Sequence, residues 1–116
     1  MNRGNLGTRG CWVRVRGPTC NLLIVGIYLP PQYAKTQAVG ILKRLRELLR
    51  ESGSHGCTIL LGDFNVRLPK KYSDVVGPYA LHHNQMTTSL KTRQLLDIMT
   101  RNGLCGINTY FRPRNK

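Results

Sequence analysis

The stretch that decides the fold is "TILLGDFNV", residues 58–66. Its apolar run leads directly into Asp63, and Asn65 follows two residues later. A short, continuous apolar run of this kind is typical of a strand buried within a sheet. Asp63 is one of only five acidic residues among 116, so its place at the end of such a strand needs an explanation.

The charge balance of the chain indicates its class of partner. Lys and Arg number 18, which gives a formal net charge of +13. A charge of this size attracts polyanions and makes their binding salt-dependent, so the expected partner is the phosphate backbone of DNA or RNA. No apolar segment is long enough for a signal-peptide core or a membrane span. We therefore expect an intracellular, soluble protein that does not bind membranes.

The four cysteines are Cys11, Cys20, Cys57 and Cys105. None forms a C-x-x-C pair, and no histidine lies at zinc-finger spacing from them. Cys57 opens an apolar run and Cys105 lies within "GLCGI", where a small apolar side chain fits. We expect buried, unpaired thiols in a reducing compartment rather than metal ligands or disulfides.

Hydrophobic periodicity predicts alternating strands and helices in one domain over residues 1–116, after a disordered segment at 1–10. In chain order, the predicted elements are a strand at 11–17, a strand at 21–29, a helix at 34–51, a strand at 57–62, a long loop at 63–88, a helix at 89–101 and a strand at 106–111. The run at 21–29 is apolar almost throughout, which predicts a strand covered on both faces.

The central strand–helix–strand unit predicts a right-handed crossover between two parallel strands. The carboxyl ends of both strands then lie at one edge of the sheet. Tyr28 ends the first strand and Asp63 follows the second. Ligand sites of α/β sheets favour this edge, so the two residues are expected to be neighbours although 35 positions separate them.

Asp63 and Asn65 have two explanations on their sequence alone. Gly-Asp-x-Asn is favourable turn chemistry, because Asp and Asn side chains bond nearby backbone and tolerate unusual φ. Alternatively, the carboxylate binds a divalent cation or orients a water molecule, while the amide donates to a phosphate oxygen. Such a pair suits phosphodiester hydrolysis, where catalysis depends mostly on positioning and charge stabilisation.

Four segments carry a family resemblance. They are "GIYLPP" (26–31), "TILLGDFNV" (58–66), "VVGPYAL" (75–81) and "RQLLDIMTRNGLCGINTYF" (93–111). Together they resemble the middle of the endonuclease/exonuclease/phosphatase superfamily. They are most similar to the apurinic-type endonuclease domains of non-LTR retrotransposons and to craniofacial-development-protein-2-like proteins. The resemblance extends over nearly the whole chain from Trp12 onward.

The resemblance implies a fold and a reaction. The fold is a two-sheet α/β sandwich of mixed sheets around a parallel β-α-β core, here only partly present. The reaction is hydrolysis of phosphodiesters by water with Mg²⁺ or Mn²⁺. Tyr28 matches the family's active-site tyrosine. Asp63 matches the aspartate that orients the water, with an indirect role at the metal. Asn65 matches the asparagine that contacts the scissile phosphate.

Other family positions find no match. The resemblance implies a metal-binding glutamate before Trp12 and a histidine after the "NTYF" segment, and neither is present. The domain is therefore expected to be truncated at both ends and to have little hydrolytic activity alone. His82 and His83 are interpreted as solvated loop residues, and Asp97 as the ion-pair partner of its helix neighbours.

Two other classes stay open. A non-catalytic, basic nucleic-acid-binding remnant is consistent with the net charge of +13 and with Arg67, Lys70 and Lys71 close after the GDFN motif. Recognisable RNA-binding motifs with interleaved stacking aromatic residues are absent, which weighs against this alternative. A remnant that does not fold stably is the third possibility, because a sheet without its edge strands exposes apolar faces.

Overall fold

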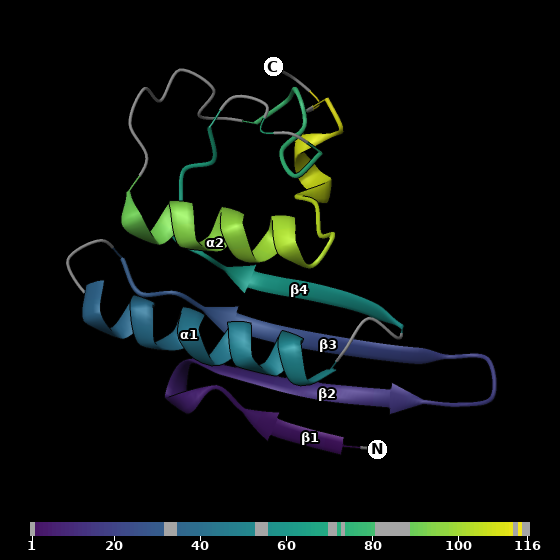
Figure 1. The fold of residues 1–116 in the computed structure, drawn as a ribbon. Helices are drawn as coiled ribbons and strands as arrows, with labels where there is room; N and C mark the ends of the chain where they lie inside the picture. The colour runs from purple at the N-terminus through teal and green to yellow at the C-terminus, as the bar shows by residue number, and fades with distance from the viewer. Residues whose placement is uncertain are drawn as a thin grey trace. The chain divides into compact units, whose positions relative to one another are not determined.

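The computed structural model describes residues 2–31, 35–52, 56–69, 72, 74–80, 89–112 and 114. Within them the chain forms a mixed α/β fold of four strands and two α-helices, with the short 3₁₀ helices η1 and η3 (Figure 1). The α/β fold class is therefore confirmed. The chain divides into two compact units, residues 1–65 and 66–116, which are described separately. The single domain expected over 1–116 stays a prediction.

The first unit is built on one sheet. Its strands are β1 (Asn2–Asn5), β2 (Gly10–Arg16), β3 (Asn21–Tyr28) and β4 (Cys57–Asp63). They lie in the order β1-β2-β3-β4, with β3 and β4 parallel and the other pairs antiparallel. The Gly17 N–H donates to the Cys20 oxygen at 2.7 Å and closes the hairpin between β2 and β3. The predicted hairpin and parallel β-α-β unit are confirmed.

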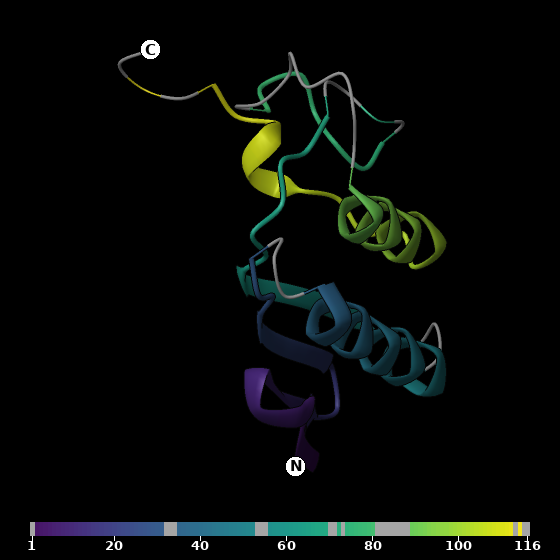
Figure 2. The same cartoon turned by 90° about the vertical axis from the view of Figure 1, so that its left-hand side faces the viewer.

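Helix α1 (Lys35–Ser52) connects β3 to β4 and covers one face of the sheet (Figures 1 and 2). Every second residue of β3 is buried on that face, namely Leu23, Val25 and Ile27. The buried residues of α1 recur at helical spacing and are Ala38, Ile41, Leu42, Leu45 and Leu49. This pattern shows that an amphipathic helix packed on alternate strand residues forms the core of the unit.

The opposite face of the sheet is less covered. The strand register pairs Ile24 with Ile59 and Gly26 with Leu61, so these residues share one face. Ile59 is 43% exposed and Leu61 is 51% exposed. On β3 itself Ile24 is half-buried and Tyr28 is 37% exposed, so the prediction that strand 21–29 is covered on both faces is wrong. The apolar run specified a strand, but α1 supplies cover for only one side of it.

The cysteines correct a second expectation. All four are free and exposed. A Cβ added at Gly26 would lie 3.9 Å from the Cys11 Sγ and 3.9 Å from a Leu61 methyl group, so Cys11 lies on the less covered face. Cys57 pairs with Leu22 in the register. The prediction of buried thiols is wrong: it rested on the apolar neighbours of Cys57 and Cys105 in the sequence, and these neighbours do not cover either side chain.

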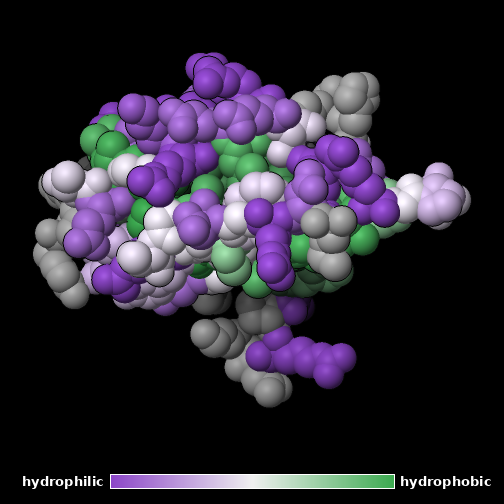
Figure 3. Space-filling view, turned by 90° about the horizontal axis from the view of Figure 1, so that it is seen from below, coloured by the Kyte–Doolittle hydropathy of each residue, from purple (hydrophilic) through white to green (hydrophobic). Residues whose placement is uncertain are grey.

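The N-terminal segment is ordered where the composition indicated a loose one. Strand β1 pairs with β2, and η1 (Gly7–Arg9) joins the two strands. Leu6 is buried, and its N–H donates to the Gly10 oxygen at 2.8 Å. Pairing along a strand uses backbone groups, which a Gly- and Asn-rich composition does not remove. Figure 3 views the molecule from below Figure 1 and shows mostly hydrophilic side chains on this surface, with apolar ones exposed between them.

The predicted strand at 106–111 is also wrong, because the segment contains η3 (Ile107–Thr109). The Thr109 hydroxyl and N–H both donate to the Gly106 oxygen, at 2.6 and 2.9 Å. Such local bonds compete with a strand ladder. The Thr109 hydroxyl also accepts from the Gly77 N–H at 2.7 Å, which joins η3 to the segment around Gly77 within the second unit.

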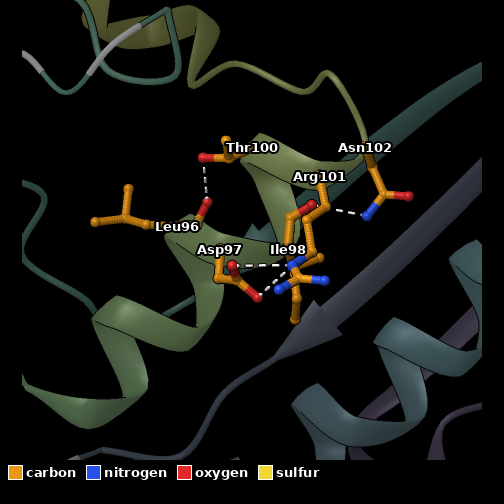
Figure 4. A network of polar contacts seen from close by, with 6 residues as sticks. All are labelled: Leu96, Asp97, Ile98, Thr100, Arg101 and Asn102. Carbon is orange, nitrogen blue, oxygen red and sulfur yellow. Dashed lines mark hydrogen bonds and ion pairs between the residues drawn. The ribbon is translucent and has the colours of Figure 1, made fainter.

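Helix α2 (Leu90–Arg101) confirms the predicted helix at 89–101. Ser89 is its N-cap, with the hydroxyl accepting from the Thr92 N–H at 3.2 Å. Figure 4 shows its last turns, where Asp97 and Arg101 form the expected ion pair at 3.0 Å. Of the helices in the described ranges, none combines the length and apolar character needed to cross a membrane.

Candidate functional site

Tyr28 and Asp63 lie side by side at the carboxyl edge of the sheet. They are paired residues in the parallel register of β3 and β4. Beyond them the Leu29 N–H donates to the Asp63 oxygen at 2.8 Å, which extends the ladder by one bond. The parallel crossover therefore brings the two residues together as the sequence predicted. Tyr28 is 37% exposed and Asp63 is exposed, so both are accessible to a ligand.

Gly62 allows the strand to end in this form. Its φ is +137°, a conformation that L-residues rarely adopt. A Cβ placed there would lie 1.9 Å from the Ile27 backbone oxygen, far inside van der Waals contact. Only glycine therefore lets β4 approach β3 closely at the residue before Asp63. The glycine of the GDFN motif thus has a structural role that periodicity alone did not indicate.

Asn65 fixes the turn after β4. Its backbone N–H donates to Asp63 Oδ1 at 3.0 Å, which is the turn bond that the Asp-x-Asn spacing favours. Its φ is +46°, in the left-handed region that asparagine tolerates better than most residues. Its Nδ2 donates to the Leu29 oxygen at 2.8 Å. Asn65 therefore ties the turn to the end of β3 with its side chain.

These bonds limit what each group can still offer. An asparagine amide carries two N–H donors, and the Leu29 carbonyl uses one of them. One amide donor of Asn65 is thus left for a ligand. Asp63 uses Oδ1 for the turn, and no described residue donates to Oδ2. The turn explanation and the chemical explanation therefore apply to different atoms of the same two side chains.

The fit of these residues to a metal ion is partial. Among the described residues, no group of three Asp, Glu, His or Cys side chains gathers as a metal-binding cluster. Asp63 supplies one exposed carboxylate. Mg²⁺ keeps several waters and is often held by one or two carboxylates together with substrate phosphates. Asp63 therefore fits a cation that is bound together with a phosphate, and it does not form a complete metal site.

Arg9 belongs to this edge and was not predicted from the sequence. It ends η1, and its guanidinium carbon lies 5.2 Å from the centroid of the Tyr28 ring. A guanidinium over a tyrosine ring is a favourable cation–π contact. The pairing of Gly10 with Ile27 brings Arg9 next to Tyr28, but the composition of residues 1–10 gave no sign of a strand there.

The predicted basic residues receive less support. Arg67 is exposed and lies in the second unit. Lys70 and Lys71 lie outside the described residues, as do His82 and His83. The structure therefore brings together Tyr28, Asp63 and Asn65, and it adds Arg9.

Comparison with known proteins adds no family assignment. No protein-family model matches the chain, and neither a curated protein nor a solved structure matches it. The residues at this edge and the resemblance of the sequence motifs are therefore what indicates a function.

Proposed function

We propose that the chain is part of a metal-dependent phosphodiesterase or endonuclease domain, which hydrolyses the nucleic-acid backbone by attack of water on phosphorus. The observation that carries this proposal is the pairing of Tyr28 with Asp63 at the carboxyl edge of a parallel β-α-β unit. Polar side chains at that edge are typical of ligand sites in α/β sheets. The motif resemblance gives the reaction class.

Each proposed role uses an atom that is not already taken up by the hydrogen bonds of the turn. Asp63 accepts a hydrogen bond from the attacking water through Oδ2 and so orients it. The Tyr28 hydroxyl donates to a phosphate oxygen, and the remaining amide N–H of Asn65 donates to the same group. Mg²⁺ or Mn²⁺ would be held mainly by the phosphate, with Asp63 contributing indirectly, and would supply positive charge that stabilises the phosphate oxygens. Catalysis of this kind rests on positioning and on charge stabilisation.

The test is cleavage of labelled abasic DNA under single-turnover conditions with Mg²⁺. We expect weak cleavage, since Asp63 is the one carboxylate at the edge among the described residues, and a further loss on the order of 10²- to 10³-fold for Asp63→Asn. Asp74→Asn is the matched control, because it also removes one exposed carboxylate but lies in the second unit. Equal cleavage by the two variants would contradict the proposal.

The second candidate is a non-catalytic basic nucleic-acid binder. Its supporting observation is the formal net charge of +13. Binding through phosphates alone predicts a steep salt dependence that neither Mg²⁺ nor Asp63→Asn alters. That result, combined with Mg²⁺-dependent cleavage no greater than background, would favour the binder over the enzyme.

We further propose that the less covered sheet face is one half of a two-sheet sandwich. Exposed apolar residues on this face support the proposal, namely Val15, Ile59 and Leu61. Face-to-face packing of two sheets buries such alternate residues. The double variant Ile59→Lys, Leu61→Lys should then bind less of the dye ANS, while its free energy of unfolding changes little. Unchanged dye fluorescence would show that this face is not the exposed apolar surface.

A further inference from the structure

A surface pocket of the first unit lies between η1 and α1. Its volume is about 330 Å³, at the small end of the roughly 300–1,000 Å³ of ligand pockets. Its polar lining consists of Arg9 and Thr8 from the η1 side and Thr36, Gln37 and Arg44 from α1. No carboxylate is among the residues that line it. The pocket therefore has positive charge and hydroxyl donors without a negative group.

Two arginines from different elements converge on this pocket. Gly7 has a φ of +75°, and a Cβ placed there would lie 3.5 Å from Arg44 Nη1, so the Arg44 guanidinium reaches η1. Arg9 lines the same pocket while its guanidinium lies over the Tyr28 ring. Within the described ranges, neither arginine forms an ion pair. Like charges that gather without a counter-charge favour the binding of an anion.

We propose that this pocket binds a backbone phosphate of a nucleic acid, next to the phosphate held at Tyr28 and Asp63. The inference rests on the proposed function and deepens it by naming a second contact of the substrate. Guanidinium groups match phosphate oxygens through paired N–H donors. Because Arg9 contacts both the pocket and Tyr28, a strand bound at the sheet edge continues into the pocket.

The first test measures binding of a fluorescent 12-nucleotide oligothymidylate by anisotropy, in EDTA and at several salt concentrations. We expect Arg9→Gln and Arg44→Gln each to weaken binding roughly fivefold more than the control Arg50→Gln. Each should also reduce the slope of log K against log salt by about 0.7, the value for one phosphate contact on single strands. Arg50 is the matched control, since it is an exposed arginine of α1 that does not line the pocket.

A second arm blocks the pocket without changing charge. Gly40 lines the pocket, and a Cβ placed there meets no atom within 4 Å. Gly40→Gln should therefore place a side chain in the pocket and weaken oligothymidylate binding more than Gly40→Ala, which adds a single carbon. Both substitutions replace an exposed helical glycine by a better helix former, so loss of folding is not expected.

A third arm distinguishes the source of the phosphate. Inorganic phosphate is titrated into the wild type and Arg44→Gln, with amide chemical shifts of residues around the pocket as the readout. The proposal expects weaker binding of both probes by Arg44→Gln. It is overturned if the pocket variants bind oligothymidylate as Arg50→Gln does, or if only phosphate binding is affected. Since EDTA prevents cleavage, failure of the Asp63-dependent reaction would leave these binding constants unchanged, so the two proposals fail separately.

Discussion

The two faces of the sheet in residues 1–65 are similar in composition and different in surroundings. On the face under α1, Leu23 and Val25 are 1% and 0% exposed, whereas Ile59 and Leu61 on the other face are 43% and 51% exposed. Tyr28 and Asp63 belong to the second face by register. The covered face therefore carries the stability of the unit, and the candidate site lies at the end of the less covered face.

Truncating one leucine on each face of the sheet should give the largest difference in unfolding free energy. Leu45 of α1 is fully buried, so Leu45→Ala should cost about 2–5 kcal/mol of unfolding free energy. Leu61→Ala removes the same atoms from a half-exposed position and should cost less than about 1 kcal/mol. Urea unfolding followed by circular dichroism measures both values. Similar costs would show that another surface covers Leu61 in solution.

Gly62→Ala tests the end of the strand that carries the site. The added Cβ meets the Ile27 oxygen at a positive φ, so a loss of about 1–3 kcal/mol is expected. Gly40→Ala is its matched control, because it adds the same atom to an exposed helical position and should stabilise by about 0.5–1 kcal/mol. Thermal unfolding separates the two. A neutral Gly62→Ala would mean that β4 ends differently from the structure.

The sequence predicted the covered face better than the other. Helical periodicity located α1, and the continuous runs located β3 and β4, so the shared edge of Tyr28 and Asp63 followed from topology. Periodicity does not say what lies on the far side of a strand, which is why Cys57, at the start of an apolar run, was expected to be buried although it is exposed.

The site residues that end a strand, Tyr28 and Asp63, could be predicted from the sequence. The bond from Asn65 to the Leu29 oxygen joins residues 36 apart and depends on turn geometry, so spacing alone did not reveal it. Arg9 was missed for a similar reason. Its place over Tyr28 depends on the pairing of β2 with β3, and its segment lacks the apolar pattern by which strands are recognised.

Tyr28→Phe separates function from stability on the less covered face. The ring that Arg9 contacts is kept and only an exposed hydroxyl is lost, so unfolding should change by less than about 0.5 kcal/mol. If the hydroxyl contacts the phosphate, single-turnover cleavage of abasic DNA should fall by roughly tenfold or more. Unchanged cleavage alongside a large loss of stability would assign Tyr28 to packing instead.

Tyr110→Phe gives the smallest effect and tests a part of the chain outside the sheet. Partial desolvation of its hydroxyl, which donates to the Asp74 oxygen, raises the pKa of Tyr110, and negative charge on Cys105 and Asp74 raises it further. Since the folded state favours the protonated phenol, the stabilisation is present below the ordinary pKa of about 10 and is lost as the pH rises through the folded-state value.

The urea midpoint of the wild type should therefore fall more between pH 8 and pH 11 than that of Tyr110→Phe. The difference in unfolding free energy between Leu45→Ala and Leu61→Ala at pH 8 should be the same in the wild-type and Tyr110→Phe backgrounds. The reason is that the covered face owes its stability to apolar burial, which does not titrate. If Tyr110→Phe altered that contrast, the two units would be coupled in unfolding. The difference between the faces would then no longer be a property of residues 1–65 alone.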